Sequence, residues 1–325
     1  MLNSSLTSAS PAPSVSVVIV VWNAQKYVVE CLESLERECG HLRPEIIVVD
    51  NASSDGTPEL IETQFPDIKL IRNLENFGFA RANNIGIAQS KGEYVCLVNS
   101  DVKFIHDCFT PMIEHMRTHP DVAMLGPKML ASDRTVRRST MRFPTIWNEF
   151  CRAVCLDLLF KNSPTFGGQL MADFNHTKTS DVEVLNGWFW MVPRNVLAEI
   201  GLLDEQFFMY GEDIDWCYRF RKSGKRIVFF ADAEAIHYGG ASSSAAPMRF
   251  SVELERGTRQ FLRKHHSAIS RAGLFLVSLT YHGLRAIGYG ALSVLKRPGR
   301  SEAVLKFHRS IACLGWLVRS RSSSG

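Results

Sequence analysis

Short apolar runs alternate with amphipathic stretches along the first hundred residues. The runs are rich in β-branched residues and nearly continuous, which is typical of strands buried on both faces of a parallel sheet. Strands are expected at residues 15–21, 45–50, 68–72 and 94–98, and helices at 24–38, 57–64 and 79–88. This alternation predicts an α/β fold, with a mostly parallel central sheet flanked by helices and joined by right-handed crossovers.

After about residue 127 the pattern becomes irregular. A basic stretch is followed by an apolar helix candidate, a buried aromatic segment and two further helices. These features lie at residues 134–142, 147–160, 187–192, 194–200 and 212–223. A strand at 226–230 and a Gly/Ser-rich loop at 239–246, interpreted as a lid over a ligand, complete this region. We expect a flexible leader over residues 1–14, a catalytic domain over 15–265 and a basic amphipathic helical tail over 266–325.

The composition agrees with a globular protein. The 325 residues are 46% hydrophobic and 22% charged, which excludes a disordered or fibrous chain. The chain contains no run of 18 or more uncharged apolar residues, so we expect no ordinary membrane-spanning helix. The first 14 residues carry no basic residue and no apolar core, so we expect no secretory signal and a cytoplasmic location. The eight cysteines show no CxxC spacing and are interpreted as scattered thiols.

The positive charge is concentrated at the C-terminal end. Residues 257–325 contain twelve Lys or Arg and a single acid, Glu302, although the whole chain carries only +4. On a helix, Leu274, Val277, Tyr281 and Leu284 share one face with Leu295. This pattern predicts an anchor on the anionic inner face of the cell membrane, and a helix packed on the catalytic domain is the alternative. No nucleic-acid-binding module is recognisable.

Polar residues follow each predicted strand of the first half. They are 22–23, 50–51, 73–78 and 99–101, and most are Asn or Asp. Such residues also form turns and helix caps. However, ligands in open α/β sheets bind at the carboxyl ends of the strands, and four such ends in one sheet favour a binding site there. No GxGxxG follows the first strand, and Gly224-Lys225 lacks the upstream glycine of a phosphate-binding loop.

Two pairs of side chains are candidates for chemistry. Asp101 and His237 each follow a predicted strand and are candidate ligands for Mg²⁺ or Mn²⁺. A structural role is the alternative for a lone histidine. Glu212 and Asp213 begin a predicted helix, where acids also complement the helix dipole.

In order along the chain, these segments resemble family 2 glycosyltransferases of the GT-A fold, in particular a bacterial rhamnosyltransferase-like branch. The matching segments are VVIVVWN at 17–23, VVDNASSDGT at 48–57, NFGFARANNIG at 76–86, LVNSD at 97–101, GLLDEQFFMYGEDID at 201–215 and IHYGG at 236–240. The resemblance covers about two thirds of the chain. It implies the GT-A nucleotide-diphospho-sugar transferase fold, with the basic region as a C-terminal helical extension.

The resemblance also assigns roles to single residues. Asp50 would hold the nucleotide base edge or ribose, and Asn23, Asn76 and Gly78 would shape the nucleotide-diphosphate cleft. Asp101 matches the metal-binding carboxylate of the family's DxD motif, whose first acid is replaced here by Asn99. His237 matches a second metal ligand. Asp213 matches the catalytic base, with Glu212 beside it as a metal or acceptor partner and fallback base.

The resemblance implies an inverting, metal-dependent glycosyltransferase. It would transfer a sugar, L-rhamnose from dTDP-rhamnose, to a saccharide or lipid-linked glycan acceptor in cell-surface polysaccharide biosynthesis. One carboxylate base and one divalent ion suit a single displacement at the anomeric carbon. A transferase of the same fold that uses a UDP- or GDP-sugar, and a catalytically silent membrane adaptor, are the alternatives. A sugar nucleotidyltransferase would need a Gly-rich basic loop after the first strand, which residues 22–25 lack.

Overall fold

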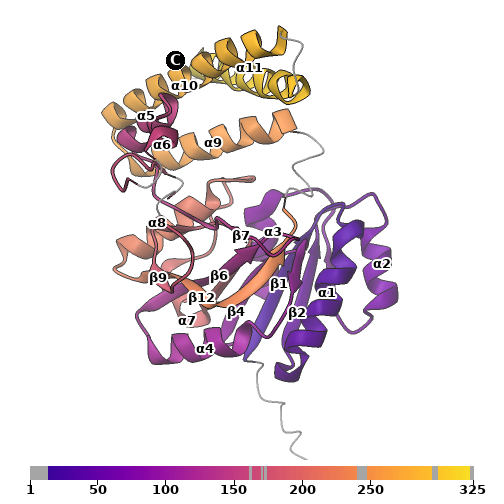
Figure 1. Cartoon of the computed structure of the whole chain (residues 1–325). Helices are drawn as coiled ribbons and strands as arrows, with labels where there is room; N and C mark the ends of the chain where they lie inside the picture. The colour runs from indigo at the N-terminus through magenta and orange to yellow at the C-terminus, as the bar shows by residue number, and fades with distance from the viewer. Residues whose placement is uncertain are drawn as a thin grey trace, which may run out of the picture.

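The computed structural model describes residues 14–160, 163–169, 171, 174–239, 247–294 and 299–322. All but residue 14 of the predicted leader, and all but residue 239 of the predicted lid, lie outside this part. Figure 1 shows two layers: a sheet with flanking helices, and a set of helices across one end of it.

The N-terminal half forms the predicted parallel sheet. Strands β1 (Val15–Val21), β2 (Glu45–Asp50), β3 (Lys69–Arg72) and β4 (Tyr94–Asn99) are parallel in the order β3-β2-β1-β4. Helices α1 (Gln25–Cys39), α2 (Thr57–Gln64) and α3 (Gly78–Gln89) connect them, and a short 3₁₀ turn, η1 (Gly40–Leu42), follows α1. These elements agree with the sequence prediction to within a residue or two, because β-branched strands and amphipathic helices each bury a periodic set of apolar side chains.

The second half extends the sheet with mixed strand directions. Strand β11 (Phe189–Pro193) is antiparallel to β4 and β6 (Val122–Leu130), and β12 (Arg226–His237) runs parallel to β6. Strand β5 (Val102–Phe104) closes the edge antiparallel to β12. Helices α4 (Phe109–Thr118), α7 (Arg194–Ile200) and α8 (Glu212–Lys222) cover this half, and short strands β7 (Val136–Arg137) and β9 (Ser180–Asp181) pair with β6 and β12. Strands β8 (Thr140–Met141) and β10 (Val184–Leu185) form a separate pair.

The last long strand continues beyond its predicted end at residue 230. Its pairing with β6 shifts between Phe230 and Glu234 and then resumes. The end of the strand also pairs with β5, where His237 is opposite Val102. The shift is an irregularity that a period-2 pattern does not reveal. Its consequence is that His237 lies beside the chain segment that carries Asp101.

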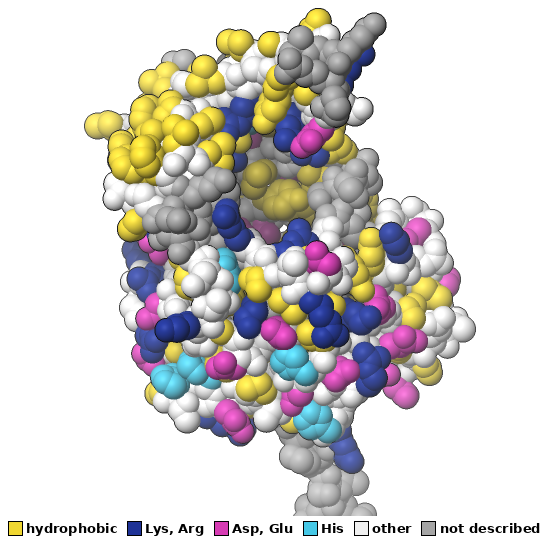
Figure 2. Space-filling view, viewed as in Figure 1, with side chains coloured by type: hydrophobic (Ala, Val, Ile, Leu, Met, Phe, Trp, Pro, Cys, Tyr) yellow, Lys and Arg dark blue, Asp and Glu magenta, His cyan; other side chains and the backbone are white. Residues whose placement is uncertain are grey.

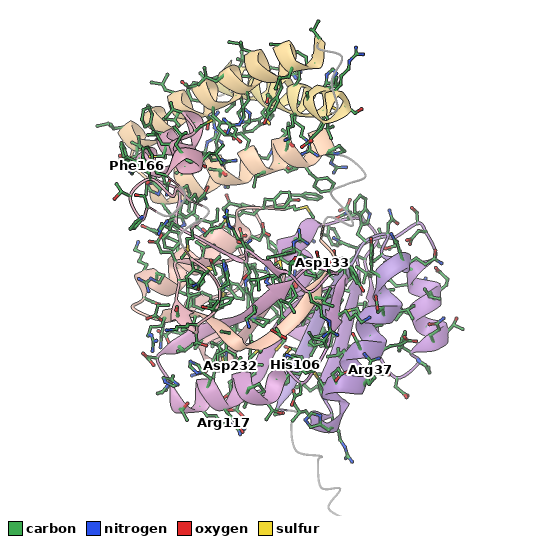
Figure 3. The ribbon with its side chains drawn as sticks, in the orientation of Figure 1. Arg37, His106, Arg117, Asp133, Phe166 and Asp232 are labelled. Atoms are coloured by element: carbon green, nitrogen blue, oxygen red, sulfur yellow. The ribbon has the colours of Figure 1, made fainter. Side chains whose placement is uncertain are left out.

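Five helices form a second layer, which we call the helical layer. They are α5 (Ile146–Ala153), α6 (Leu156–Leu159), α9 (Pro247–His265), α10 (Ala268–Val294) and α11 (Arg300–Ser322). The single helix predicted at 147–160 is divided, since Cys155 has a left-handed φ of 63°. Phe166 lies in this layer, whereas Arg117 and Asp232 lie at the opposite end of the molecule (Figure 3). The layer therefore begins before residue 266 and includes a segment from the middle of the chain.

The apolar face predicted for the tail helix faces inward in part. Leu274 is 3% exposed, and Tyr281 lines a cavity inside the helical layer, so the prediction that both belong to a membrane-facing surface was wrong. The exposed row on α10 shares only Leu284 with the predicted face, and it comprises Ile269, Leu276, Leu284, Ile287 and Val294. Among the described residues, no helix is long and apolar enough to cross a bilayer.

Candidate active site

A cleft of about 530 Å³ lies at the carboxyl ends of the strands, beside the helical layer. Figure 2 shows a hollow between the two layers, with Lys and Arg side chains on its rim. Seven of the predicted site residues line the cleft: Asn76, Gly78, Asn99, Asp101, Glu212, Asp213 and His237. They come from four separate segments of the chain, which the fold brings to one place. Asn23 and Asp50 are not among the lining residues.

Asp101 and His237 form a buried pair in this cleft. Asp101 Oδ1 lies 3.0 Å from His237 Nε2, and the backbone N–H of Gly239 donates to Asp101 Oδ2 over 3.0 Å. The Trp188 ring stacks on the imidazole, with ring centroids 5.5 Å apart. Burial raises the pKa of Asp101, but the hydrogen bond and charge of His237 outweigh it, so the net pKa is below the ordinary value. Asp101 is therefore held as a carboxylate at neutral pH.

The chemistry of this pair fits a divalent cation. Carboxylate oxygen and imidazole nitrogen both bind Mn²⁺, and ions at nucleotide sites commonly take one or two protein ligands plus substrate phosphates. Asn99 Nδ2 lies 3.4 Å from His237 Nε2, so the Asn99 side chain is next to this pair. Within the described residues, no group of three or more His, Cys, Asp or Glu side chains is placed to hold a metal. The remaining ligands would have to come from the substrate.

Asn51 organises the loop that carries Asn76 and Gly78. Its Nδ2 donates to Asn76 Oδ1 over 2.8 Å and to the Gly78 carbonyl over 3.1 Å, and its Oδ1 accepts from the Phe77 N–H. Gly78 has φ +82°, and a Cβ there would overlap the Phe208 carbonyl. Asn51 also lines the cleft. The sequence placed it among the polar residues that follow a predicted strand, but gave it no role of its own.

Asn23 and Asp50 lie next to the cleft and support its floor. Asn23 has a φ of 51°, and its Oδ1 accepts from the Ser54 N–H over 2.8 Å, which joins the loops after β1 and β2. Asp50 is 2% exposed, and its Oδ2 accepts from the Ser53 N–H over 3.2 Å. Its Oδ1 is buried with no hydrogen-bond partner in the structure. One acceptor atom at this position is therefore unsatisfied.

Glu212 and Asp213 begin α8 because the chain turns sharply at Gly211. Gly211 has φ +90°, and a Cβ there would lie 2.8 Å from the Gly257 carbonyl carbon of α9, so a side chain is excluded on both counts. Glu212 is 5% exposed, and its Oε2 is buried without a partner. Asp213 is less buried, and its Oδ1 accepts from the Ile214 N–H over 2.9 Å.

Burial raises the pKa of both carboxyl groups. The pKa of Glu212 lies well above its ordinary value because the side chain is desolvated and Asp213 is adjacent. The pKa of Asp213 is also raised by burial, against the opposing effect of the backbone N–H groups of Ile214 and Gly211. A carboxylate with a raised pKa is a stronger base at neutral pH than an ordinary one. The pair therefore has the properties of a proton acceptor.

Arginines surround the cleft. Arg137 Nη1 donates to the carbonyls of His237 and Tyr238 over 3.0 and 3.2 Å, beside the Asp101 pair. Arg138, Arg152 and Arg249 also line the cleft. The basic stretch at residues 134–142 thus contributes Arg137 and Arg138 to the cleft, whereas Trp190 is fully buried against Trp216. Arg249 lies before the predicted domain boundary at residue 265. No motif in the sequence around it indicated a role in the site.

The family model described as "Glycosyl transferase family 2" matches residues 16–200, more than half of the chain. The chain belongs to this glycosyltransferase family. The match includes the Asn76 loop and Asp101, while the carboxylates of α8 and His237 lie beyond its end.

Two curated relatives of this glycosyltransferase are named as sugar transferases. An N-acetylglucosaminyl-diphospho-decaprenol L-rhamnosyltransferase of Mycobacterium tuberculosis is 27% identical over 244 residues, covering 70% of this chain and 78% of that protein. A hexosyltransferase of low-salt glycan biosynthesis from Haloferax volcanii is 27% identical over 219 residues, covering 65% and 64%. The predicted rhamnosyltransferase-like family membership is confirmed.

A solved structure confirms the predicted GT-A fold. A mannosyltransferase from Pyrobaculum calidifontis, determined in complex with GDP-Man and Mn²⁺, superimposes with a TM-score of 0.57 at 17% identity, covering 94% of this chain and 87% of that one. The similarity extends over the sheet and into the helical layer, since nearly the whole chain is covered. At this identity it establishes the fold alone.

Proposed function

We propose that this glycosyltransferase transfers L-rhamnose from dTDP-rhamnose, with inversion and with a divalent metal, to a saccharide or lipid-linked glycan acceptor. The observation that carries the proposal is that the Asp101–His237 pair and the Glu212–Asp213 pair line one cleft. The Asp101–His237 pair has the chemistry to bind a cation together with a diphosphate. The Glu212–Asp213 pair has the chemistry to accept the proton of an attacking hydroxyl. The L-rhamnosyltransferase relative supports the sugar.

The residues of the chain would divide the work as follows. Asp101 and His237 would hold Mg²⁺ or Mn²⁺, which supplies Lewis-acid stabilisation of the charge that develops on the leaving diphosphate. Arg137, anchored on strand-end carbonyls beside this pair, adds positive charge at the same place. Asn76 and Gly78 shape the loop on the donor side. The unsatisfied Oδ1 of Asp50 is an acceptor for a hydroxyl or N–H of the nucleoside.

Asp213 is the general base in this proposal. As the acceptor oxygen attacks the anomeric carbon, the bond to the diphosphate breaks on the opposite face and the hydroxyl proton moves to the Asp213 carboxylate. A single displacement of this kind inverts the anomeric configuration. Proton removal by a positioned carboxylate contributes about 10²–10⁴-fold to the rate. Glu212, buried beside Asp213, is the fallback base.

We also propose that the protein is cytoplasmic and attaches peripherally to the inner face of the cell membrane, where it serves cell-surface polysaccharide biosynthesis. The exposed apolar row of α10, with Ile269 84% and Ile287 74% exposed, supports a membrane contact. The basic charge of the C-terminal region suits an anionic bilayer. A membrane location would bring the enzyme to a lipid-linked acceptor.

The test is a donor panel with the purified full chain. dTDP-rhamnose, a UDP-sugar and GDP-mannose are each incubated with Mn²⁺, Mg²⁺ or EDTA and an N-acetylglucosaminyl lipid diphosphate acceptor. Nucleoside diphosphate release and thermal stabilisation by the donor are measured. We expect dTDP-rhamnose alone to react and EDTA to abolish the reaction.

Two variants separate an enzyme from a silent adaptor. Asp213→Asn should lower transfer about 10²–10⁴-fold with donor binding retained, and Asp101→Ala should abolish metal-dependent donor binding. The control is Asp133→Asn, at an exposed position outside the cleft. Full activity in Asp213→Asn and in Glu212→Gln would refute the mechanism, and a reaction with GDP-mannose in place of dTDP-rhamnose would refute the donor.

A further inference from the structure

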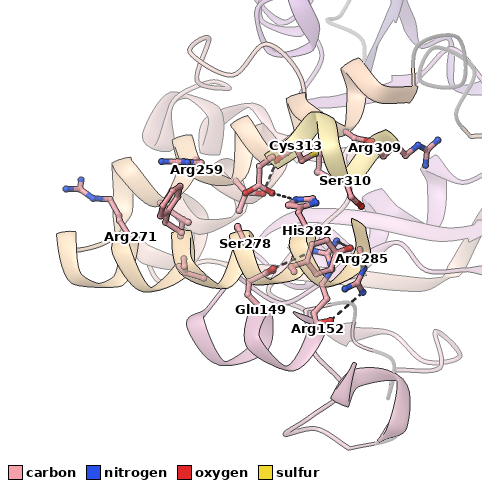
Figure 4. Close-up of a pocket in the computed structure, with 18 of the residues that line it drawn as sticks. Glu149, Arg152, Arg259, Arg271, Ser278, His282, Arg285, Arg309, Ser310 and Cys313 are labelled. Carbon is pink, nitrogen blue, oxygen red and sulfur yellow. Dashed lines mark hydrogen bonds and ion pairs between the residues drawn. The ribbon is translucent and has the colours of Figure 1, made fainter. Parts of the chain in front are cut away.

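A second cavity, of about 860 Å³, lies inside the helical layer between α5, α9, α10 and α11 (Figure 4). Its lining contains seven Lys or Arg and only two acids, Glu149 and Glu255. The cationic residues are Arg152, Arg259, Arg263, Arg271, Arg285, Lys306 and Arg309. The catalytic machinery described above uses none of these seven except Arg152, which lines both spaces.

The two acids do not neutralise this charge. Glu255 Oε2 lies 3.4 Å from His282 Nε2, so that acid already has a partner in the cavity wall. Glu149 lies 3.6 Å from Arg152, but burial raises the pKa of Glu149 and favours its neutral form. Burial and then the charge of Arg263 lower the pKa of Arg259, which shows that cations face one another here. Arg259 and Arg285 are half-buried at the cavity wall, and an excess of positive charge there favours an anionic ligand.

Buried polar atoms without partners also point into this region. His282 is 9% exposed, and its Nδ1 has no hydrogen-bond partner. Its other ring nitrogen contacts Glu255, whose Oε1 is likewise buried and unsatisfied. Buried polar groups in folded proteins are nearly always paired. The cavity therefore has hydrogen-bonding capacity that the protein itself does not use.

Apolar and aromatic side chains form another part of the lining. Leu254, Leu262, Leu274 and Phe275 contribute to the wall with Tyr281 and Tyr289. The guanidinium of Arg285 stacks on Tyr281, with Cζ 3.6 Å from the ring centroid, and Arg259 stacks on Phe275 at 4.8 Å. Cations set against an apolar wall suit a ligand that carries both phosphate and hydrocarbon.

The cavity adjoins the active-site cleft. Arg152, Leu254 and Thr258 line both this cavity and the active-site cleft, so the two spaces adjoin. The exposed apolar residues of α10 lie on the outside of the same helical layer. A molecule with its sugar at Asp213 and its lipid toward the bilayer would have its phosphates between the two, among these arginines.

We infer that this cavity binds the diphosphate and the first hydrocarbon units of a lipid-linked acceptor. The inference rests on the proposed function, because it concerns the acceptor of that same reaction. It assigns Arg152, Arg259 and Arg285 as ligands of the diphosphate. The acceptor saccharide then extends through the shared region to Asp213.

Binding of farnesyl diphosphate to the full chain tests this inference by calorimetry, with EDTA present so that a metal-dependent donor site is not measured. Farnesol and inorganic pyrophosphate are the comparison ligands, and phosphatidylglycerol vesicles test a lipid headgroup as the source of phosphate. We expect farnesyl diphosphate to bind at least tenfold more tightly than either fragment. Saturating vesicles should not displace it.

The variants are Arg259→Ala and Arg285→Ala. Each is expected to weaken the binding of farnesyl diphosphate about tenfold or more. Thermal stabilisation of each variant by dTDP-rhamnose and Mn²⁺ should stay unchanged. The matched control is Arg256→Ala, which lies on α9 next to the cavity, is paired with Glu253 and does not line the cavity. Arg285→Lys keeps the charge and should recover most of the affinity.

Several results would overturn the inference. One is equal affinity for pyrophosphate and farnesyl diphosphate. Another is displacement of bound farnesyl diphosphate by phosphatidylglycerol vesicles. The third is an equal loss of farnesyl diphosphate affinity in Arg285→Ala and Arg256→Ala. Should a variant fail to fold, the comparison of the three ligands with the wild-type chain decides. The proposed function fails separately, when Asp213→Asn retains transfer, so the two ideas can be told apart.

Discussion

The carboxylate of Asp215 on α8 lies 2.7 Å from the imidazole of His265 at the end of α9. Asp215 is fully buried and also contacts Lys264 at 2.8 Å and Arg219 at 2.9 Å. These ion pairs join the helical layer to the helix that begins with Glu212 and Asp213. The position of the proposed base thus depends on how α9 is held.

We expect Asp215→Ala to lower the free energy of unfolding by about 3–5 kcal/mol, because it removes the buried carboxylate that pairs with Arg219, Lys264 and His265. Burial raises the pKa of Asp215, but Lys264, His265 and Arg219 together lower it by more. The net pKa is therefore below the ordinary value. The stabilisation is therefore complete above the ordinary Asp pKa and is lost as pH falls through the lowered pKa.

Urea unfolding at neutral and acid pH measures this effect. The control is Glu62→Ala, which breaks an exposed ion pair with Arg72 and should change stability little. Equal stability losses in the two variants would argue against a special role for Asp215.

Glu212→Gln should raise the melting temperature at neutral pH. The pKa of Glu212 lies well above its ordinary value, so the folded state favours the protonated form. Stability then declines as pH rises from the ordinary Glu pKa through the raised one, and glutamine removes this decline. Melting curves across pH check it, with the exposed Glu114→Gln as control. A lower melting temperature in Glu212→Gln at neutral pH would contradict the prediction.

The transfer rate should fall on the acid side at a pH above the ordinary range of aspartate. Burial raises the pKa of Asp213, and the base acts only when ionised. Asp101 has a lowered pKa, so its carboxylate stays ionised over this range and does not produce the acid limb. The measurement is kcat against pH with dTDP-rhamnose and saturating Mn²⁺. An acid limb at or below the ordinary aspartate pKa would refute this assignment.

Gly78→Ala should destabilise the protein by more than about 1 kcal/mol and weaken donor binding. The residue has φ +82°, and its Cβ would overlap the Phe208 carbonyl. Gly283→Ala is the matched control, because no atom lies within 4 Å of its Cβ and it stands inside α10. That change should stabilise the protein by about 0.5–1 kcal/mol. Denaturant unfolding and calorimetric donor binding give the comparison.

Ile287→Glu and Leu276→Glu should weaken attachment to phosphatidylglycerol vesicles, because each places a charge on the exposed apolar row of α10. Both side chains are more than half exposed, so the fold should tolerate the change. Leu74→Glu is the control, since Leu74 is 99% exposed on the catalytic body. Vesicle sedimentation measures the bound fraction. Equal binding of all three variants would refute the membrane contact.

The sequence alone determined the parallel half of the sheet, its helices and the residues at the strand ends, because each depends on local periodicity and on short motifs such as 97–101. It also identified Asp101, Asp213 and His237 as candidates. Only the tertiary structure decided that His237 lies opposite Val102 beside Asp101, since that depends on an irregular pairing late in β12. The cavity lined by Arg152, Arg259 and Arg285 was equally hidden, because helices distant in sequence form it and no periodicity records which of their faces meet.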